Sequence, residues 1–523
     1  MDKNTLLAVI LSLFVLVGWT FLTQKNTVPK NAGPAEEIPL KQDQAVAVKK
    51  EQPPIQKPGT VTPTETAGEE ITVETDLYKA IFSTRGAIIK YWELKHFNND
   101  GTSVVLLKEQ GTIPALGLML DGLPQKLIYK ASTNNLVLSK DRKKDGKLIF
   151  EYSNNGTVIR KKFVFHNDKY KVDLSIDTVN TPPYMLAIGT YFSMDDKTKR
   201  EHIGPVLLAN DKRKEFDKKM DKTENFTGYI SWIAQEDKYF AAALIPVTLV
   251  EGATVWKETN SAEIALKLEP QNNEFIFYAG PKEYDRLKSF NSGFENIIDF
   301  GWFSIVAMPL FWVLKFFYSF LGNYGWSIVL LTIVTRVPFI PIMHKSQQSM
   351  KKMQTIQPMM AEIKERFKDD AQKQQKEMMQ LYKKHKVNPI GGCLPMVLQI
   401  PVFIALYNVL LNAIELRGSP FMLWITDLSA PDTLISGLLG LPFALGPLPL
   451  LMGATMVLQQ KMTPSAMDPK QAKMMMLMPV VFTFMFLSFP AGLVVYWLVN
   501  NVLGIAQQYY ANQKADKKPA VAK

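Results

Sequence analysis

A series of apolar stretches after Asp299 constrains the fold of this 523-residue chain more than any other feature. A helix that crosses a bilayer needs about 20 apolar residues, because it rises about 1.5 Å per residue through a hydrocarbon core of about 30 Å. We therefore predict an α-helical membrane core in residues 323–512. Its five spans are expected at about 326–343, 389–411, 444–462, 473–489 and 493–509.

Residues 300–321, which precede this core, carry Lys315, Pro309 and many aromatic side chains. Aromatic rings and lysine are typical of the headgroup boundary of a membrane. We therefore expect an amphipathic interfacial helix here rather than a further span.

The N-terminus predicts a membrane anchor. Residues 5–22 form an uncharged apolar run, and no pattern of small residues that would mark a cleavage site follows it. We therefore expect an uncleaved signal-anchor helix in residues 1–25 rather than a cleaved signal peptide. Residues 26–70 are rich in Pro, Lys, Glu, Gln and Thr, and they predict a flexible tether because they offer little apolar surface to bury.

Residues 71–282 predict an all-β domain. Val172, Leu174 and Ile176 alternate with polar residues, as in a strand with one face in water. Asn155-Gly156 joins two such stretches and predicts a tight hairpin. Many strands in this length indicate a β-sandwich. Its acidic residues are expected to be solvated, and no pair of carboxylates can be assigned to catalysis; a sugar- or peptide-binding cleft stays open.

The distribution of charge sets the expected orientation. Lys and Arg exceed Asp and Glu by 60 − 49 = 11, and eleven of the basic residues fall in residues 344–386. Residues 461–473 and the tail 513–523 are also basic, whereas residues 413–433 hold only Arg417. The positive-inside rule then places the basic segments and both termini in the cytoplasm, and the β domain on the outer side of the membrane.

Residues 344–386 predict a cytoplasmic helical hairpin, with Asp369-Asp370 as a helix cap between its two helices. Its charge alone does not select among anionic lipid, ribosomal RNA and an incoming chain. Cys393 is the only cysteine, and the five histidines lack metal-ligand spacing. The sequence therefore excludes an intramolecular disulfide framework, and we expect no metal, no cofactor and no enzymatic activity.

Arg336 lies inside an apolar block, about ten residues or roughly 15 Å from Trp326. A charge at that depth costs at least about 2.5–3.5 kcal/mol. One explanation is a side chain that reaches the cytoplasmic headgroups. The other is a water-filled cavity lined by neutral polar residues, and the chain supplies Thr332 four residues earlier on the same helical face. Further polar residues in other spans are Gln399, Asn500 and Asn501. We favour the cavity.

The fourth span opens with several methionines and continues with Phe482, Phe486 and Phe489 at helical spacing. Ordinary packing is the default explanation of such a stripe. Flexible methionine is also typical of surfaces that accept varied apolar partners.

Several motifs occur in order between residues 300 and 510: LTIVTRVPFIP, KVNPIGGCLPMVLQIPVFIALYNVL, ELRGSPFMLWITDLSAPD, MGATMVLQQKMTP and MPVVFTFMFLSFPAGLVVYWLVNN. Together they resemble the YidC/Oxa/Alb family of membrane protein insertases, in the bacterial form with a large periplasmic domain. The resemblance implies a periplasmic β-supersandwich. It also implies a hydrophilic groove that is open to the cytoplasm and to lipid and closed toward the outside. Members insert and fold membrane proteins, alone or beside the Sec translocon, without nucleotide hydrolysis.

The resemblance places the family's groove arginine on Arg336, its threonine on Thr332, and its aromatic pair on Tyr496 and Trp497, where the second member is often tyrosine. We predict that a polar or acidic segment of the substrate enters this groove while its apolar stretch slides along the second and fourth spans. The predicted groove residues are Arg336, Thr332, Gln399, Tyr496, Trp497 and Asn500. The predicted apolar slide consists of Phe403, Met475, Phe482 and Phe486.

The expected partners are nascent membrane proteins, the Sec translocon, transiently the ribosome, and membrane lipids, with no small-molecule substrate. The expected location is the bacterial inner membrane, with several spans. The alternative is a polytopic transporter or channel with a mid-membrane polar site, which would be expected to show internal repeats or several intramembrane ionisable groups; neither is visible. Residues 434–449 look longer than the usual external loop, and the sequence offers no account of them.

Overall fold

The computed structural model describes residues 68–99, 101–109, 112–120, 122–141, 143–189, 202–217, 219–258, 261–387, 394–462 and 469–516. The predicted signal anchor, nearly all of the tether and the end of the basic tail lie outside these residues.

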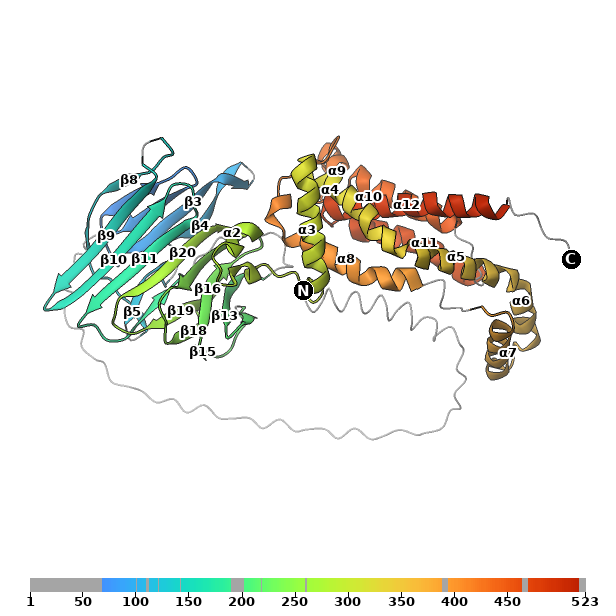
Figure 1. Cartoon of the computed structure of the whole chain (residues 1–523), viewed down its shortest axis with the longest axis horizontal. Coiled ribbons are helices and arrows are strands. Elements are labelled where there is room, and N and C mark those ends of the chain that lie inside the picture. The colour runs from blue at the N-terminus through green and yellow to red at the C-terminus, as the bar shows by residue number, and fades with distance from the viewer. Residues whose placement is uncertain are drawn as a thin grey trace, which may run out of the picture. The chain divides into compact units, whose positions relative to one another are not determined.

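Three β-sheets form the first half of the described chain (Figure 1). The first, in spatial order, consists of β4 (Thr102–Lys108), β3 (Ile88–Asn99), β2 (Tyr78–Ser83), β1 (Glu70–Glu74) and β8 (Asn135–Val137). The second consists of β14 (Lys212–Glu215), β13 (Gly204–Ala209), β16 (Ile230–Glu236), β17 (Phe240–Pro246), β20 (Asn273–Pro281), β11 (Lys171–Val179), β10 (Thr157–His166), β9 (Asp145–Asn154) and β7 (Lys130–Ala131). The third consists of β15 (Glu224–Thr227), β18 (Gly252–Lys257), β19 (Ala262–Leu268), β12 (Tyr184–Ala187), β5 (Leu118–Leu120) and β6 (Leu123–Pro124).

The predicted hairpin at Asn155-Gly156 is confirmed. Both residues have positive φ, 49° and 79°, as the tight turn between β9 and β10 requires. The alternating apolar residues of β10 and β11 then fall on one buried face. Phe82 of β2 packs against Phe163 of β10 with ring centroids 5.1 Å apart, so the first two sheets meet face to face as in a sandwich.

The β domain buries charged side chains at several separate places. Lys161 of β10 is fully buried, and its ammonium donates to three backbone oxygens, those of Gly86 (3.1 Å), Ala87 (3.1 Å) and Leu116 (2.8 Å). Burial lowers the pKa of Lys161 to about 7. Glu263 of β19 is also fully buried, and burial raises its pKa to about 7.

Glu236 of β16 is a further buried charge, and two cations pair with it. It accepts from Arg213 Nη2 at 2.8 Å and from Lys282 Nζ at 3.0 Å. Arg213 also donates to the backbone oxygen of Ile297 at 3.3 Å. This cluster fixes the segment that leaves the β domain, which contains α2 (Tyr284–Lys288) and the 3-10 turn η1 (Phe294–Ile297).

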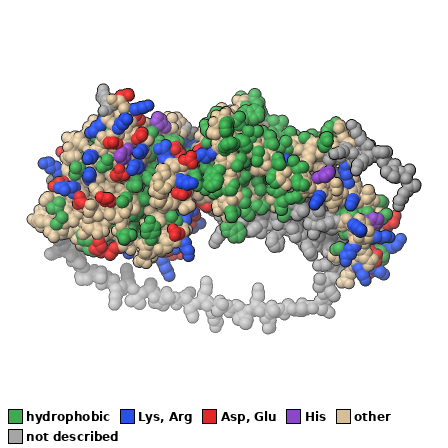
Figure 2. Space-filling model, viewed as in Figure 1, with side chains coloured by type: hydrophobic (Ala, Val, Ile, Leu, Met, Phe, Trp, Pro, Cys, Tyr) green, Lys and Arg blue, Asp and Glu red, His purple; other side chains and the backbone are tan. Residues whose placement is uncertain are grey.

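Helices form the second half of the chain. They are α3 (Ser304–Leu321), α4 (Tyr324–Arg336), the 3-10 turn η2 (Val337–Phe339), α5 (Ile340–Thr355), α6 (Gln357–Arg366), α7 (Ala371–Lys384), α8 (Leu394–Asn412), the 3-10 turn η4 (Ile414–Leu416), α9 (Leu434–Leu439), α10 (Pro447–Met462), α11 (Pro469–Phe486) and α12 (Ala491–Asp516). Figure 2 shows hydrophobic side chains over much of this half, whereas blue Lys and Arg side chains gather near its α6–α7 end.

The helices match the predicted segments with shifted ends. The first predicted span consists of α4, η2 and the start of α5, because Pro338 lacks the N–H that would continue α4. The basic segment is three helices rather than two, since α5 continues to Thr355 before α6 and α7 fold back on each other. Asp370 caps α7 by accepting from the backbone N–H of Lys373 at 2.9 Å, as expected.

Among the described residues, two helical stretches are long and apolar enough to cross a membrane: Ser304–Leu321 and Tyr324–Thr355. The first covers the segment for which the sequence predicts an interfacial helix, and by length and composition it could also cross the membrane. One of its faces packs inward through Ala307, Phe311 and Leu314, and the other exposes large apolar side chains. Shorter apolar helices occur at Val397–Asn412 and Met475–Phe486.

Candidate functional site between α4, α8 and α12

Arg336 is the last residue of α4, and its side chain reaches α12. Nη1 donates to the backbone oxygen of Asn500 at 2.6 Å and also to the side-chain oxygen of that residue. Thus a partly buried asparagine, not a carboxylate, holds one edge of the guanidinium, and the cation keeps its full charge. The predicted pairing of Arg336 with neutral polar groups is present for Asn500.

Gly504, one turn after Asn500 on α12, leaves the space that this arrangement needs. A Cβ at this position would lie 3.1 Å from Nη2 of Arg336 and 2.7 Å from Nε2 of Gln459 on α10. Any larger residue would therefore press on both side chains. The glycine allows α4, α10 and α12 to bring polar groups together at one point.

The opposite edge of the Arg336 guanidinium is unpaired. Nε and Nη2 are buried, and among the described residues neither has a hydrogen-bond partner. The N–H of Nε and one N–H of Nη2 point in the same direction, in the geometry that matches the two oxygens of a carboxylate. Buried donors without partners are uncommon. This edge therefore offers two donors to a carboxylate, or to the carbonyl oxygens of a peptide, once the groups that cover it move aside.

A polar stripe continues along α12. Asn501 donates to the hydroxyl of Thr455 on α10 at 3.1 Å, and Gln508 accepts from Gln347 of α5 at 2.8 Å. Sequence reasoning noted Asn501 but missed the other members. The signal that could have found the α12 members is their spacing, because Asn501, Gly504 and Gln508 recur every three to four positions and therefore share one face of the helix. The members that were missed are Gln347, Gln459, Gly504 and Gln508.

Thr332 and Gln399, two other predicted groove residues, do not contact the guanidinium. Thr332 is buried, and its hydroxyl donates to the backbone oxygen of Ile328 on its own helix at 2.7 Å. Gln399 of α8 donates to the hydroxyl of Tyr496 on α12 at 3.4 Å. The predicted groove residues thus form two pairs, Arg336 with Asn500 and Gln399 with Tyr496, and Thr332 is satisfied locally.

Trp497 lies at the centre of an aromatic cluster. Its ring centroid is 4.9 Å from that of Phe403 on α8 at nearly a right angle, 5.1 Å from that of Phe486 and 6.1 Å from that of Phe482 on α11. Three predicted slide residues therefore pack together between helices, and Phe486 is fully buried. Met475, the fourth, is partly exposed at the other end of α11.

The exposed apolar face of α11 is formed by residues other than Phe482 and Phe486. Phe484 is 67% exposed, and further large apolar side chains of the helix are also exposed. They are Met476, Leu477, Val480, Val481 and Met485. Phe482 and Phe486 therefore face the interior of the bundle, and the outward face of α11 is a separate apolar surface.

Residues 413–446, which we call the α8–α10 connection, are hydrogen-bonded to the first residues of two core helices. The side chain of Asn323, just before α4, donates to the backbone oxygen of Phe421 at 3.0 Å. The N–H of Ala491, the first residue of α12, donates to the backbone oxygen of Ala430 at 2.8 Å. These bonds tie the first residues of α4 and α12 together, about 14 Å along α12 from Asn500.

The helices α6 and α7 pack on each other through a small apolar cluster and expose basic side chains. Ile356, Met360 and Val387 form the buried part of the cluster. No group of three or more His, Cys, Asp or Glu side chains that could hold a metal ion occurs in the described ranges.

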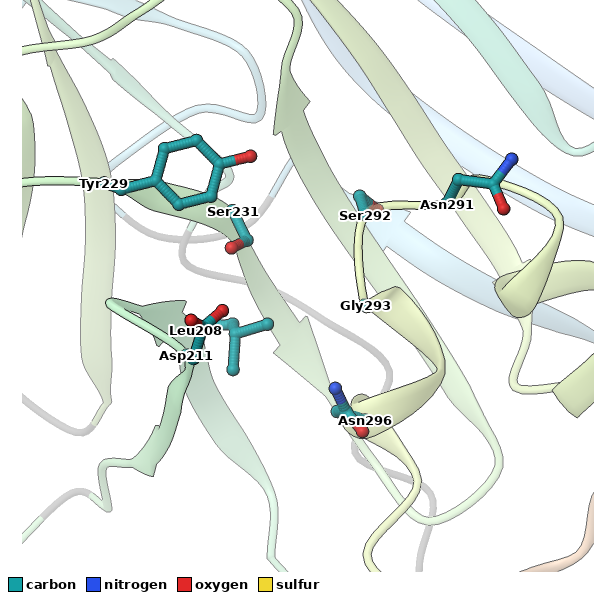
Figure 3. Close-up of a pocket in the computed structure, with 8 residues that line it drawn as sticks. All are labelled: Leu208, Asp211, Tyr229, Ser231, Asn291, Ser292, Gly293 and Asn296. Atoms are coloured by element: carbon teal, nitrogen blue, oxygen red, sulfur yellow. The ribbon is translucent and has the colours of Figure 1, made fainter.

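A polar cavity of about 280 Å³ lies in the β domain (Figure 3). Asp211, Tyr229 and Ser231 line one side, and Asn291 and Asn296 line the other. Sequence reasoning did not single out these residues, because their pattern is that of ordinary turns.

Comparison with known proteins identifies relatives for both halves. The YidC periplasmic domain model matches residues 70–313, and the 60Kd inner membrane protein model matches residues 316–518. The chain is 41% identical to the membrane protein insertase YidC of Pelobacter propionicus over 543 residues, which covers 98% of this chain and 99% of that protein. It is 41% identical to the membrane protein insertase YidC of Geotalea uraniireducens over 546 residues, with the same coverage. It is also similar to the crystal structure of an active YidC insertase with its first transmembrane domain resolved, with 20% identity, a TM-score of 0.39, and coverage of 85% of this chain and 93% of that chain.

Proposed function

The chain belongs to the family of YidC membrane protein insertases, and on that premise we propose how its helical half takes up a membrane protein, called the client below. As a member of this family it is an inner-membrane insertase with a periplasmic domain, and it is not an enzyme. The mechanism therefore rests on binding, burial and charge.

The proposed arrangement has five spans in the helical core: α4 with the start of α5, then α8, α10, α11 and α12. The α6–α7 hairpin and both termini lie in the cytoplasm, and the α8–α10 connection faces the periplasm with the β domain. The charge pattern supports this orientation, because residues 344–386 hold eleven Lys and Arg whereas the connection holds only Arg417. The α3 helix lies along the periplasmic interface.

The unpaired edge of Arg336 carries the proposal. A client has a short polar or acidic segment that must cross the membrane, and its carboxylate or peptide oxygens would pair with Nε and Nη2. At about 4 Å and an effective dielectric of about 20, one such charge pair is worth about 4 kcal/mol, and less where water screens it. This attraction replaces part of the hydration that the segment loses.

The groove around Arg336 is proposed to be hydrophilic, open to the cytoplasm and to lipid, and closed at the periplasmic end by the α8–α10 connection. Asn500, Gln399 and Tyr496 supply neutral polar groups near the cation, which keep it solvated without neutralising it. The client segment would then travel less than a full membrane thickness before release to the periplasm.

The aromatic cluster around Trp497 is the proposed contact for the apolar part of the client. Phe403, Phe482 and Phe486 lie on facing sides of α8 and α11, so a client helix that separates these two helices would replace one apolar contact by another. Met475 extends this surface toward the cytoplasm. Partition of the client into lipid, at about 25 cal/mol per Å² of apolar surface, would then drive release.

The proposed partners are nascent membrane proteins and membrane lipids, with the Sec translocon beside the helical core and the ribosome transiently at the basic hairpin. The charge of the hairpin supports the last assignment, since ribosomal RNA and anionic lipid headgroups both attract lysine.

Site-specific photo-crosslinking to stalled nascent membrane proteins tests the proposal. A crosslinker at Gln399 or Trp497 should capture the client. The matched controls are Phe484, on the outward face of α11, and Leu249, an exposed leucine of the β domain. Capture at the control positions as strong as at Gln399 and Trp497, or no capture at the latter two, would contradict the proposed site.

A further inference from the structure

The α8–α10 connection exposes an unusual number of large apolar side chains. Residues 433–446 contain no charged residue. Leu438 and Leu439 at the end of α9 are 78% and 67% exposed. Other exposed apolar side chains of the connection are Met422, Leu423, Leu434 and Phe443. A soluble surface seldom gathers so many apolar groups without a function.

A buried carboxylate holds the connection in place, so these leucines project from a fixed backbone. Asp432 Oδ2 accepts from the indole N–H of Trp424 at 3.1 Å and from the backbone N–H of Leu448 at 2.8 Å. The backbone N–H of Ser436 donates to the oxygen of Leu445 at 2.9 Å, which closes the loop around α9. The fixed backbone turns Leu438 away from the bundle.

The exposed surface of α10 continues the apolar character of the loop. Leu450 and Leu451, in the first turn of α10, are about half exposed, and Leu458 follows further along the helix. The chain carries no charge from residue 433 to residue 460. Because lipid covers the outward side of a membrane-spanning helix, the simplest occupant of the adjoining loop surface is the same lipid. A water-facing loop or a charged partner would call for charged side chains, which this stretch lacks.

We propose that residues 434–446, the apolar loop, insert into the periplasmic leaflet of the bilayer, where acyl chains cover Leu438, Leu439 and Phe443. The six residues of α9 are too few to cross the bilayer, so the loop enters one leaflet and returns. The side of the membrane rests on the orientation proposed above, whereas contact with lipid does not. The loop thereby anchors the closed end of the bundle at a fixed depth.

Fluorescence quenching in lipid vesicles tests this inference. Cys393 is the only cysteine, so a Cys393→Ser background allows one labelled cysteine at a time. The full-length protein would carry an environment-sensitive fluorophore at Leu438→Cys. The matched control is Leu249→Cys, because Leu249 is 80% exposed but lies in the β domain. Client insertion at the level of the Cys393→Ser parent shows that both labelled proteins are folded.

The inference predicts blue-shifted emission at position 438, strong quenching by brominated lipid and loss of quenching by aqueous iodide, with the reverse pattern at position 249. Iodide quenching at 438 equal to that at 249 would overturn it, since the loop would then face water. Resistance to both quenchers would also overturn it, since protein would then cover the loop. Iodide added outside the vesicles quenches the fluorophore at position 249 only in molecules whose β domain faces outward. This control therefore detects an error in the proposed orientation separately from the contact of the loop with lipid.

Discussion

Replacing Gly504 by alanine should impair insertion more than it impairs folding. The new Cβ would lie 2.7 Å from the Gln459 amide and 3.1 Å from Nη2 of Arg336. The flexible amide can rotate away, whereas the guanidinium is held by Asn500 and must shift. Overpacking costs about 1–3 kcal/mol, and the gain from replacing glycine in a helix offsets about 1 kcal/mol. The net loss of stability is therefore about 0–2 kcal/mol.

The displaced guanidinium should bind an acidic client segment less well. A loss of about 1 kcal/mol of attraction corresponds to about fivefold weaker binding of the client segment. Thermal unfolding in detergent measures stability, and insertion into vesicles of two clients that differ only in an acidic or neutral translocated tail measures function. We expect Gly504→Ala to slow the acidic client selectively.

Gly437→Ala is the matched control, because no atom lies within 4 Å of a Cβ at this position in α9. It should stabilise the protein by up to about 1 kcal/mol and leave insertion of both clients unchanged. The reasoning is refuted if Gly504→Ala inserts both clients as well as the parent does, or if both glycine variants lose insertion equally.

Two further predictions concern buried carboxyl and amino groups. The β domain should be least stable near pH 7. The pKa of Lys161 is about 7 in the folded protein and about 10.4 in the unfolded chain, so the free energy of unfolding rises above pH 7 by up to about 1.4 kcal/mol per pH unit. The pKa of Glu263 is about 7 in the folded protein and about 4.3 in the unfolded chain, so the free energy of unfolding falls as the pH rises from about 4.3 to 7. Thermal unfolding of the whole protein from pH 5 to 9 checks this. Lys161→Met should remove the rise in stability above pH 7, and Glu263→Gln should remove the fall in stability below pH 7. A stability maximum at pH 7 would contradict the prediction. Asp432→Asn should cost about 1–3 kcal/mol, because the one amide oxygen can accept from Trp424 and Leu448 only if the amide NH2 group faces the backbone N–H of Leu434, which donates to Oδ1 of Asp432 at 3.3 Å. Proteolysis of the α8–α10 connection should accelerate, and unchanged protection would show that the carboxylate does not hold the loop.

Local signals in the sequence predicted local structure well. Asn155-Gly156 predicted the β9–β10 hairpin because few residue pairs accept two positive φ values. Asp370 predicted the start of α7 because a carboxylate before a helix satisfies a free N–H. Arg336 stood out because a charge in an apolar block needs an explanation.

The facing of each helix could not be predicted in the same way. The stripe that contains Phe482 and Phe486 shows which residues of α11 share a face, but lipid and protein interior are equally apolar, so the stripe does not reveal which side turns inward. The contribution of Gly504 depends on Gln459 and Arg336, which approach it from other helices. Such a requirement arises only from the tertiary arrangement, and a single sequence contains no mark of it.

The most direct test of the account is the insertion of acidic-tailed and neutral-tailed clients by proteins with changes at Arg336. The unpaired Nε and Nη2 edge predicts a graded loss for the acidic client, with Arg336→Lys weaker than the parent and Arg336→Ala weaker still, because lysine supplies charge without two parallel donors. The neutral client should change little. Equal insertion of the acidic client by all three proteins, in vesicles that contain them at equal amounts, would contradict the role of the guanidinium.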